Sequence, residues 1–196
     1  MRGLSAERFR VREDGVRQQI ATFSDASDLP LTLGMAIDSS ASMFVKLPMV
    51  QNAAIDFLHS TFSEQDRAFV VDFDSEPRLA RGTTGNLDRI VTSIGSLEAS
   101  GRTALWESIV FSLVQLQGVR GRKALIVFSD GADEDPEFSY RTCLRFARTV
   151  GAPIYFILSN NEILRTQGKG LSVRGLLGRL RVLPQEGADV PWDGGV

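Results

Sequence analysis

Residues 31–42 read LTLGMAIDSSAS, an apolar run that ends in an acid and continues into hydroxyl side chains. A segment that is apolar at nearly every position, rather than at every second one, is typical of a strand buried on both faces of a parallel sheet. The pattern therefore predicts a buried strand over 31–38. It also places Asp38, Ser40 and Ser42 at alternate positions, starting at the end of that strand.

Strands of the same kind recur along the chain and alternate with segments of helical periodicity. Residues 122–131 (RKALIVFSDG) hold five consecutive apolar residues, whereas residues 103–117 repeat apolar side chains at helical spacing. This alternation predicts an α/β fold, a doubly wound and mostly parallel sheet flanked by helices on both faces. The other expected elements are strands over 66–73 and 152–159, a short antiparallel edge strand over 78–84, and helices over 48–62, 87–97, 139–150 and 173–180.

Length and composition exclude several classes of protein. The chain has 196 residues, which suits one domain with an arm. Its 22 basic and 24 acidic residues give a net charge of −2, which argues against general nucleic-acid binding. One cysteine and one histidine exclude a disulfide framework and a Cys/His zinc site built by this chain alone. No apolar run reaches the roughly 20 residues that cross a bilayer, and the first residues lack the apolar region of a secretory signal.

Hard oxygen donors gather at places where such a sheet binds ligands, beyond the carboxyl ends of its strands. Asp38, Ser40 and Ser42 follow the first buried strand, Thr103 begins the most apolar helix, and Asp130 follows the clearest strand. Two carboxylates and three hydroxyls suit a six-coordinate cation such as Mg²⁺ or Mn²⁺ better than Zn²⁺. Because five donors leave a coordination position open, the set predicts a site that accepts an Asp or Glu carboxylate from a partner.

The same residues also have structural interpretations. Asp and Ser are favoured at helix N-caps, so Asp38, Ser40 and Ser42 could cap the helix that follows, and Thr103 alone fits an N-cap. Asp130 could begin a turn with the glycine after it. These interpretations leave the combination of five donors as a coincidence, so we prefer the metal site.

The motif Asp38-x-Ser40-x-Ser42, with the distant Thr103 and Asp130, resembles the metal-ion-dependent adhesion site of the von Willebrand factor A domain. The resemblance covers about residues 31–180 and implies a Rossmann-like sheet of strand order 3-2-1-4-5-6, with its third strand antiparallel. It implies that the strands carrying Asp38 and Asp130 are neighbours, and that the site holds Mg²⁺, or Mn²⁺ or Ca²⁺ in its place. Ala41 stands where the family commonly has glycine.

Two charged residues lie near the expected rim of this site. Arg102 precedes Thr103 and could steer an acidic ligand toward the ion, although an exposed arginine is the ordinary interpretation. Asp133 begins the acidic run 133–135, which could tune the local field or bind a second ion, although a solvated loop is the ordinary interpretation. We expect Arg102 and Asp133 to be rim residues.

The chain divides into an arm over 1–30, a domain over 31–180 and an irregular tail over 181–196. Asp14-Gly15 predicts a hairpin turn in the arm. The arm resembles the end of a β-rich segment that precedes the A domain in a bacterial group of related proteins, which implies a chain that begins part-way through that architecture and an extracytoplasmic location. The tail shows no convincing strand, so we expect no regular final strand and an unpaired edge at 152–159.

The sequence favours a binding module over an enzyme. In the leading hypothesis, the cation accepts a carboxylate from a protein partner, as in adhesion and other protein–protein interactions, with no role for nucleic acid or a membrane span in this chain. A second hypothesis is a scaffold subunit of a larger assembly, similar to the A-domain proteins that accompany ATPases. The third and weakest is a metal-dependent hydrolase, which would need a general base beside the ion.

Overall fold

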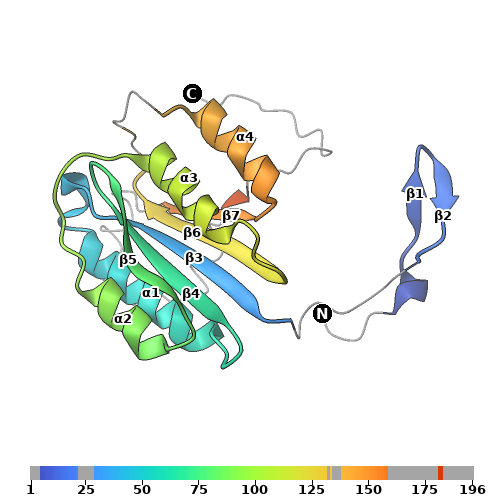
Figure 1. The fold of residues 1–196 in the computed structure, drawn as a ribbon, viewed down its shortest axis with the longest axis horizontal. Helices are drawn as coiled ribbons and strands as arrows, with labels where there is room; N and C mark the ends of the chain where they lie inside the picture. The colour runs from blue at the N-terminus through green and yellow to red at the C-terminus, as the bar shows by residue number, and fades with distance from the viewer. Residues whose placement is uncertain (1–4, 22–28, 132, 134–137, 159–180, 183–196) are drawn as a thin grey trace, which may run out of the picture.

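A computed structural model of the chain describes residues 5–21, 29–131, 133, 138–158 and 181–182. Its centre is a six-stranded sheet in the order β5-β4-β3-β6-β7-β8 (Figure 1). This order confirms the one implied by the resemblance, and β3 and β6 are neighbours as expected. The strands are β3 (Leu31–Asp38), β4 (Arg67–Phe73), β5 (Pro77–Thr84), β6 (Arg122–Ser129), β7 (Ile154–Leu158) and β8 (Arg181–Val182).

The four central strands run parallel, and both edge strands run antiparallel to their neighbours. β3 pairs in parallel with β4 and with β6, and β6 pairs in parallel with β7. β5 turns back against β4, as its sequence predicts, with Asp72 opposite Arg78. The carboxyl ends of all four parallel strands therefore lie at the same end of the sheet.

Helices cover both faces of the sheet. α1 and α2 lie on one face, and α3 and α4 lie on the other (Figure 1). Each face has its own core because successive strand residues point to opposite sides: Met35 packs with α1 and α2, and Ala36 packs with α3. The helices are α1 (Leu47–Thr61), α2 (Leu87–Gly95), α3 (Leu105–Leu116) and α4 (Tyr140–Val150).

The middle of β3 carries a glycine because a neighbouring ring fills the space beside it. A Cβ atom at Gly34 would lie 2.5 Å from Cζ of Phe69 and 3.0 Å from Cδ1 of Leu125. Protein interiors are close-packed, so such an overlap would displace the ring or the strand. Gly34 thus allows β4 and β6 to pack closely on both sides of the strand that carries Asp38.

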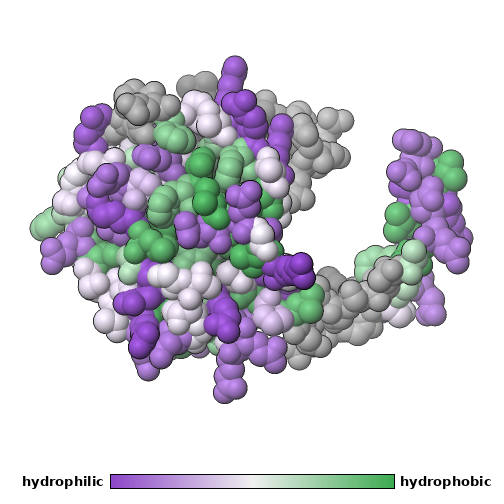
Figure 2. All heavy atoms as spheres, in the orientation of Figure 1, coloured by the Kyte–Doolittle hydropathy of each residue, from purple (hydrophilic) through white to green (hydrophobic). Residues whose placement is uncertain are grey.

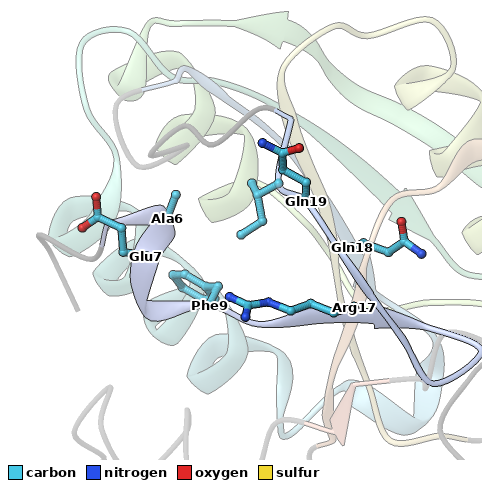
Figure 3. A pocket seen from close by; sticks show the side chains of 7 residues that line it. Ala6, Glu7, Phe9, Arg17, Gln18 and Gln19 are labelled. Atoms are coloured by element: carbon cyan, nitrogen blue, oxygen red, sulfur yellow. The ribbon is translucent and has the colours of Figure 1, made fainter.

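The arm forms a separate two-stranded sheet of β1 (Val11–Glu13) and β2 (Val16–Gln18). Asp14 and Gly15 connect the strands with φ angles of +48° and +79°, the left-handed conformations of a type I′ hairpin turn. The expected hairpin is thereby confirmed. A short 3-10 helix (Ala6–Arg8) precedes it, and Figure 3 shows the hollow between the two elements, where Phe9 and Arg17 are among the lining residues.

The expectation of an unpaired edge at 152–159 is wrong. Val182 and Arg181 pair antiparallel with Tyr155 and Phe156 of β7, so the segment expected to be irregular contributes a strand. Two residues are too few to produce a hydrophobic period, which is why the sequence pattern does not reveal this strand. The expected helix 173–180 and the rest of the tail lie outside the described residues.

Polar and apolar side chains are mixed over the visible face of the domain (Figure 2). Within the part of the chain that the structure describes, no helix combines the length and the apolar character needed to span a bilayer.

Candidate functional site

The candidate site lies at the carboxyl ends of β3 and β6. Asp38 is the last residue of β3, and Asp130 directly follows the last residue of β6. The register pairs Ile37 with Phe128, so the two acids leave the sheet from adjacent strand ends. The strand order therefore brings together two carboxylates that are 92 positions apart in the sequence.

Asp38 is fully buried, and its carboxylate accepts two hydrogen bonds. The backbone N–H of Ser40 donates to Oδ1 over 2.9 Å, and the hydroxyl of Ser129 donates to Oδ2 over 2.6 Å. Burial raises the pKa of Asp38 above its ordinary value, the charge of Asp130 raises it further, and the hydrogen bonds oppose both effects. A charged Asp38 is therefore costly in this position, and a cation bound beside it would relieve that cost.

The two serine hydroxyls of the motif lie next to each other. Oγ of Ser40 is 3.1 Å from Oγ of Ser42. Two oxygens bound to Mg²⁺ at right angles would be about 3.0 Å apart, given bonds of roughly 2.1 Å. Ser40 stands at the N-cap of the short 3-10 helix Ala41–Met43 but makes no side-chain capping bond there. Its hydroxyl is thus spaced as a ligand would be and does not serve as a cap.

Backbone hydrogen bonds hold the loop that carries Thr103 against the loop of the serines. The N–H of Ser100 donates to the carbonyl of Ser39 over 2.7 Å, and the N–H of Ala41 donates to the carbonyl of Gly101 over 3.1 Å. Thr103 itself is buried. The alternative that Thr103 caps a helix is wrong, because the N-cap of α3 is Ala104.

A cluster of charged residues holds the loop that carries Thr103 in place. The carboxylate of Asp74 accepts from the hydroxyl of Ser100 over 3.0 Å, and its backbone carbonyl accepts from the N–H of Ala104 over 2.8 Å. Arg78 donates to Asp74 over 2.8 Å and to Asp72 over 3.0 Å. The hydrogen bond from Arg78 is the main reason that the pKa of Asp74 falls to about 2. Asp74 is therefore ionised at neutral pH, and it holds the loop at both ends, through Ser100 and Ala104.

Gly101 allows this loop to approach Asp74 closely. Its φ angle of +68° lies in the left-handed region, which side chains other than glycine rarely adopt. A Cβ atom there would lie 2.7 Å from Oγ of Ser75 and 3.1 Å from Cγ of Asp74. Both backbone conformation and space therefore require glycine at this position.

Lys46 is a member of the site that the sequence does not reveal. Its ammonium lies 3.0 Å from Oδ2 of Asp130, and the two side chains are only 12% and 13% exposed. The pair joins residues 84 positions apart, so no local pattern predicts it. A cationic side chain thus already contacts one of the two carboxylates expected to bind a metal.

Comparisons with known proteins identify the family of this chain. The sequence model of the von Willebrand factor type A domain matches residues 33–132, which is about half of the chain. This chain belongs to the von Willebrand factor type A family. No curated protein matches it.

Several solved structures share the A-domain fold at low sequence identity. BatB of Bacteroides thetaiotaomicron is 16% identical, with a TM-score of 0.58 over 65% of this chain and 66% of that one. A von Willebrand factor type A structure from Catenulispora acidiphila is 16% identical, with a TM-score of 0.54 over 65% and 32%. The N-terminal domains of a type V pilus tip protein from Porphyromonas gingivalis are 19% identical, with a TM-score of 0.51 over 58% and 22%. This chain therefore spans about a fifth of the pilus tip structure.

The two expected rim residues of the A domain have structural partners. The carboxylate of Asp133 accepts from the N–H of Leu105 over 2.9 Å, so it caps the first turn of α3 just after Thr103. Arg102 is exposed, and its backbone N–H donates to the hydroxyl of Ser75 over 3.0 Å. Two large apolar residues directly before Lys46, Phe44 and Val45, are 73% and 71% exposed.

The donor set of this A domain fits a hard divalent cation. Among the described residues, no three His, Cys, Asp or Glu side chains form a metal-binding group. A site of the expected kind needs no such group, because it combines two carboxylates with three hydroxyls, all oxygen donors. Asp38, Ser40, Ser42 and Asp130 all lie at the one end of the sheet, and the loop of Thr103 is bonded to theirs.

Proposed function

We propose that this A domain is a protein-binding module in which a divalent cation accepts a carboxylate from a protein partner. The ion would be held by Asp38, Ser40, Ser42, Thr103 and Asp130. Mg²⁺ suits this donor set, and Mn²⁺ or Ca²⁺ could take its place. The observation that carries the proposal is the 3.1 Å separation of the Ser40 and Ser42 hydroxyls beside a buried carboxylate with a raised pKa.

The charges of the site favour an anionic ligand. Two carboxylates balance a divalent cation, so a ligand carboxylate meets no excess negative charge from the protein ligands. When bound, the ion supplies an open coordination position. Arg102 lies one residue from Thr103 and adds a positive charge near that position. These features suit an Asp or Glu side chain better than a neutral group.

Exposed apolar residues beside the ion favour a protein as the source of that carboxylate. Phe44 and Val45 are exposed apolar residues directly before Lys46, whose ammonium contacts Asp130. Protein–protein interfaces combine aromatic and apolar contacts at their centre with polar groups around them. One structural neighbour is a pilus tip protein, which agrees with a role in binding. The proposal is one of binding and includes no catalytic step.

Calorimetric titration of the chelator-treated chain with Mg²⁺ and Mn²⁺ tests the metal site. The informative variant is Asp38→Ala/Asp130→Ala, and the control is Asp56→Ala/Asp88→Ala, which removes two exposed carboxylates elsewhere. We expect about one ion per chain for the wild type and the control, and none for the first variant. Equal binding by both variants would overturn the assignment of the ligands.

Peptide selection tests the partner chemistry. Displayed peptides retained in Mn²⁺ and released by a chelator should be enriched in Asp or Glu, and replacing that acid by its amide should abolish binding. Retention that does not depend on metal or on an acid would instead support a scaffold that binds its partner by another surface. Phe44→Ser and Val45→Ser should weaken peptide binding while leaving metal binding unchanged.

A further inference from the structure

The ammonium of Lys46 forms a largely buried ion pair with the carboxylate of Asp130. Lys46 occupies the N-cap of α1, where its N–H donates to the carbonyl of Met43 over 2.8 Å and its carbonyl accepts from the N–H of Val50 over 3.1 Å. Because the backbone of Lys46 is fixed and both partners are largely buried, the 3.0 Å contact is shielded from water and from salt. Removing one partner of such a pair leaves the other as a buried, unpaired charge.

We propose that Lys46 is a built-in competitor for the cation, so that its ammonium and a divalent ion occupy Asp130 in turn. The inference rests on the proposed function, because it needs a metal at Asp130. An ammonium donates through up to three N–H groups to the same lone pairs that a metal would use, and the two cations repel each other at close range. Binding of the ion therefore includes the cost of displacing Lys46.

The exchange has a consequence for the partner. With Lys46 on Asp130, the group of Asp38, Asp130 and Lys46 carries a charge of −1, which repels an approaching carboxylate. With a divalent ion in place and Lys46 displaced, the same group carries +1. Lys46 directly follows the exposed pair Phe44 and Val45, so the displaced ammonium stays at the surface where a partner would bind. The exchange thus converts the rim from repelling to attracting an acidic partner.

Metal titration of Lys46→Met measures this competition, because methionine keeps the length of the side chain and removes its charge. We expect Lys46→Met to bind Mn²⁺ at least tenfold more tightly than the wild type. The matched control is Lys123→Met, which removes the same charge near the start of β6, roughly 20 Å from Asp130 along the strand. The control should bind Mn²⁺ with wild-type affinity. Lys46→Arg keeps the charge and should bind no more tightly than the wild type.

A second measurement uses the wild-type chain and does not depend on how a variant folds. The sequence has three lysines, at positions 46, 123 and 169, so acetylation of each can be followed by mass spectrometry. Adding Mn²⁺ should raise the acetylation rate of Lys46 severalfold and leave that of Lys123 unchanged. The Asp38→Ala/Asp130→Ala variant should show a high rate for Lys46 with or without the ion.

The outcomes separate this inference from the function on which it rests. Tighter binding by Lys46→Met together with faster acetylation of Lys46 in Mn²⁺ supports it. Equal or weaker binding by Lys46→Met, or an acetylation rate that Mn²⁺ leaves unchanged, overturns it while the metal site stands. If neither the wild type nor Lys46→Met binds Mg²⁺ or Mn²⁺, the proposed function fails and the inference fails with it.

Discussion

Replacing Gly101 with alanine tests whether the close contact between the Thr103 loop and Asp74 sets the geometry of the site. The change adds one methyl group, which would lie 2.7 Å from Oγ of Ser75 and 3.1 Å from Cγ of Asp74. Ser75 can rotate away only by losing the hydrogen bond from the N–H of Arg102, and Asp74 is fixed by its bonds to Arg78 and Ser100. The loop must therefore move away from Asp74.

Two terms set the expected loss of stability. An alanine at a φ angle of +68° costs about 1 kcal/mol relative to glycine. Forcing a methyl group into occupied space costs about 1–3 kcal/mol more. We therefore expect Gly101→Ala to lower the free energy of unfolding by about 2–4 kcal/mol.

Gly118 provides a matched control for the first term. It follows α3 with a φ angle of +76°, and a Cβ atom there would meet nothing within 4 Å. Gly118→Ala should therefore cost about 1 kcal/mol, which is the backbone term alone. Urea denaturation of both variants measures the difference, and Mn²⁺ titration measures its effect on the site. Gly101→Ala should bind the ion at least tenfold more weakly, whereas Gly118→Ala should bind it as the wild type does.

Equal destabilisation by the two substitutions would refute this reasoning, because it would show that the contact with Asp74 costs nothing to relax. A large loss of stability in Gly101→Ala with unchanged affinity for Mn²⁺ would refute the second half. In that case the position of the Thr103 loop would not determine metal binding.

Two further predictions concern ionised groups and are measured by urea denaturation across pH without divalent ions. Burial raises the pKa of Asp38, so the contribution of protonated Asp38 to stability is present below an unfolded-state pKa near 3.8 and is lost as pH rises through the folded-state pKa. Asp38→Asn should therefore be more stable than the wild type at pH 7 but not at pH 3. A stability advantage that does not change with pH would contradict this. Arg78 lowers the pKa of Asp74 from 3.8 to about 2, so the contribution of this pair to stability is present above pH 4 and is lost as pH falls through 2. Arg78→Met should lower the free energy of unfolding by about 1 kcal/mol at pH 7 after solvent screening, since Arg78 is 44% exposed. This loss of stability should shrink between pH 4 and pH 2.

The sequence predicts the main elements of the fold because each has a strong period. The buried strands are apolar at nearly every position, and the helices repeat apolar residues every three or four positions. The expected strand 31–38 agrees with β3, and the expected helix 48–62 is shifted by one residue from α1. Asp38 and Asp130 are close because β3 and β6 are neighbours in the sheet. The family resemblance implies this strand order, whereas hydrophobic periodicity alone does not.

Two charged contacts of the site differ in how far the sequence could have predicted them. Asp72 and Arg78 are direct cross-strand partners in the β4–β5 hairpin, so pairing the expected strands 66–73 and 78–84 would have placed the two charges together. Lys46 directly precedes α1 and Asp130 directly follows β6, so the two residues are 84 positions apart in the sequence. No periodicity indicates which of several carboxylates a lysine side chain reaches.

The backbone bonds that join the loops of the site do not involve the atoms that would bind the ion. The loops after β3, after β4 and before α3 are joined through the backbone, where Ser39 donates to Phe73, Ser100 donates to Ser39, and Ala41 donates to Gly101. None of these bonds uses a side-chain oxygen of the proposed ligand set, so the framework exists without the ion. A preorganised site avoids the entropic cost of ordering loops when a ligand binds. If Lys46 competes with the cation as proposed, one substitution at that position should change the affinity for the ion more than it changes the fold.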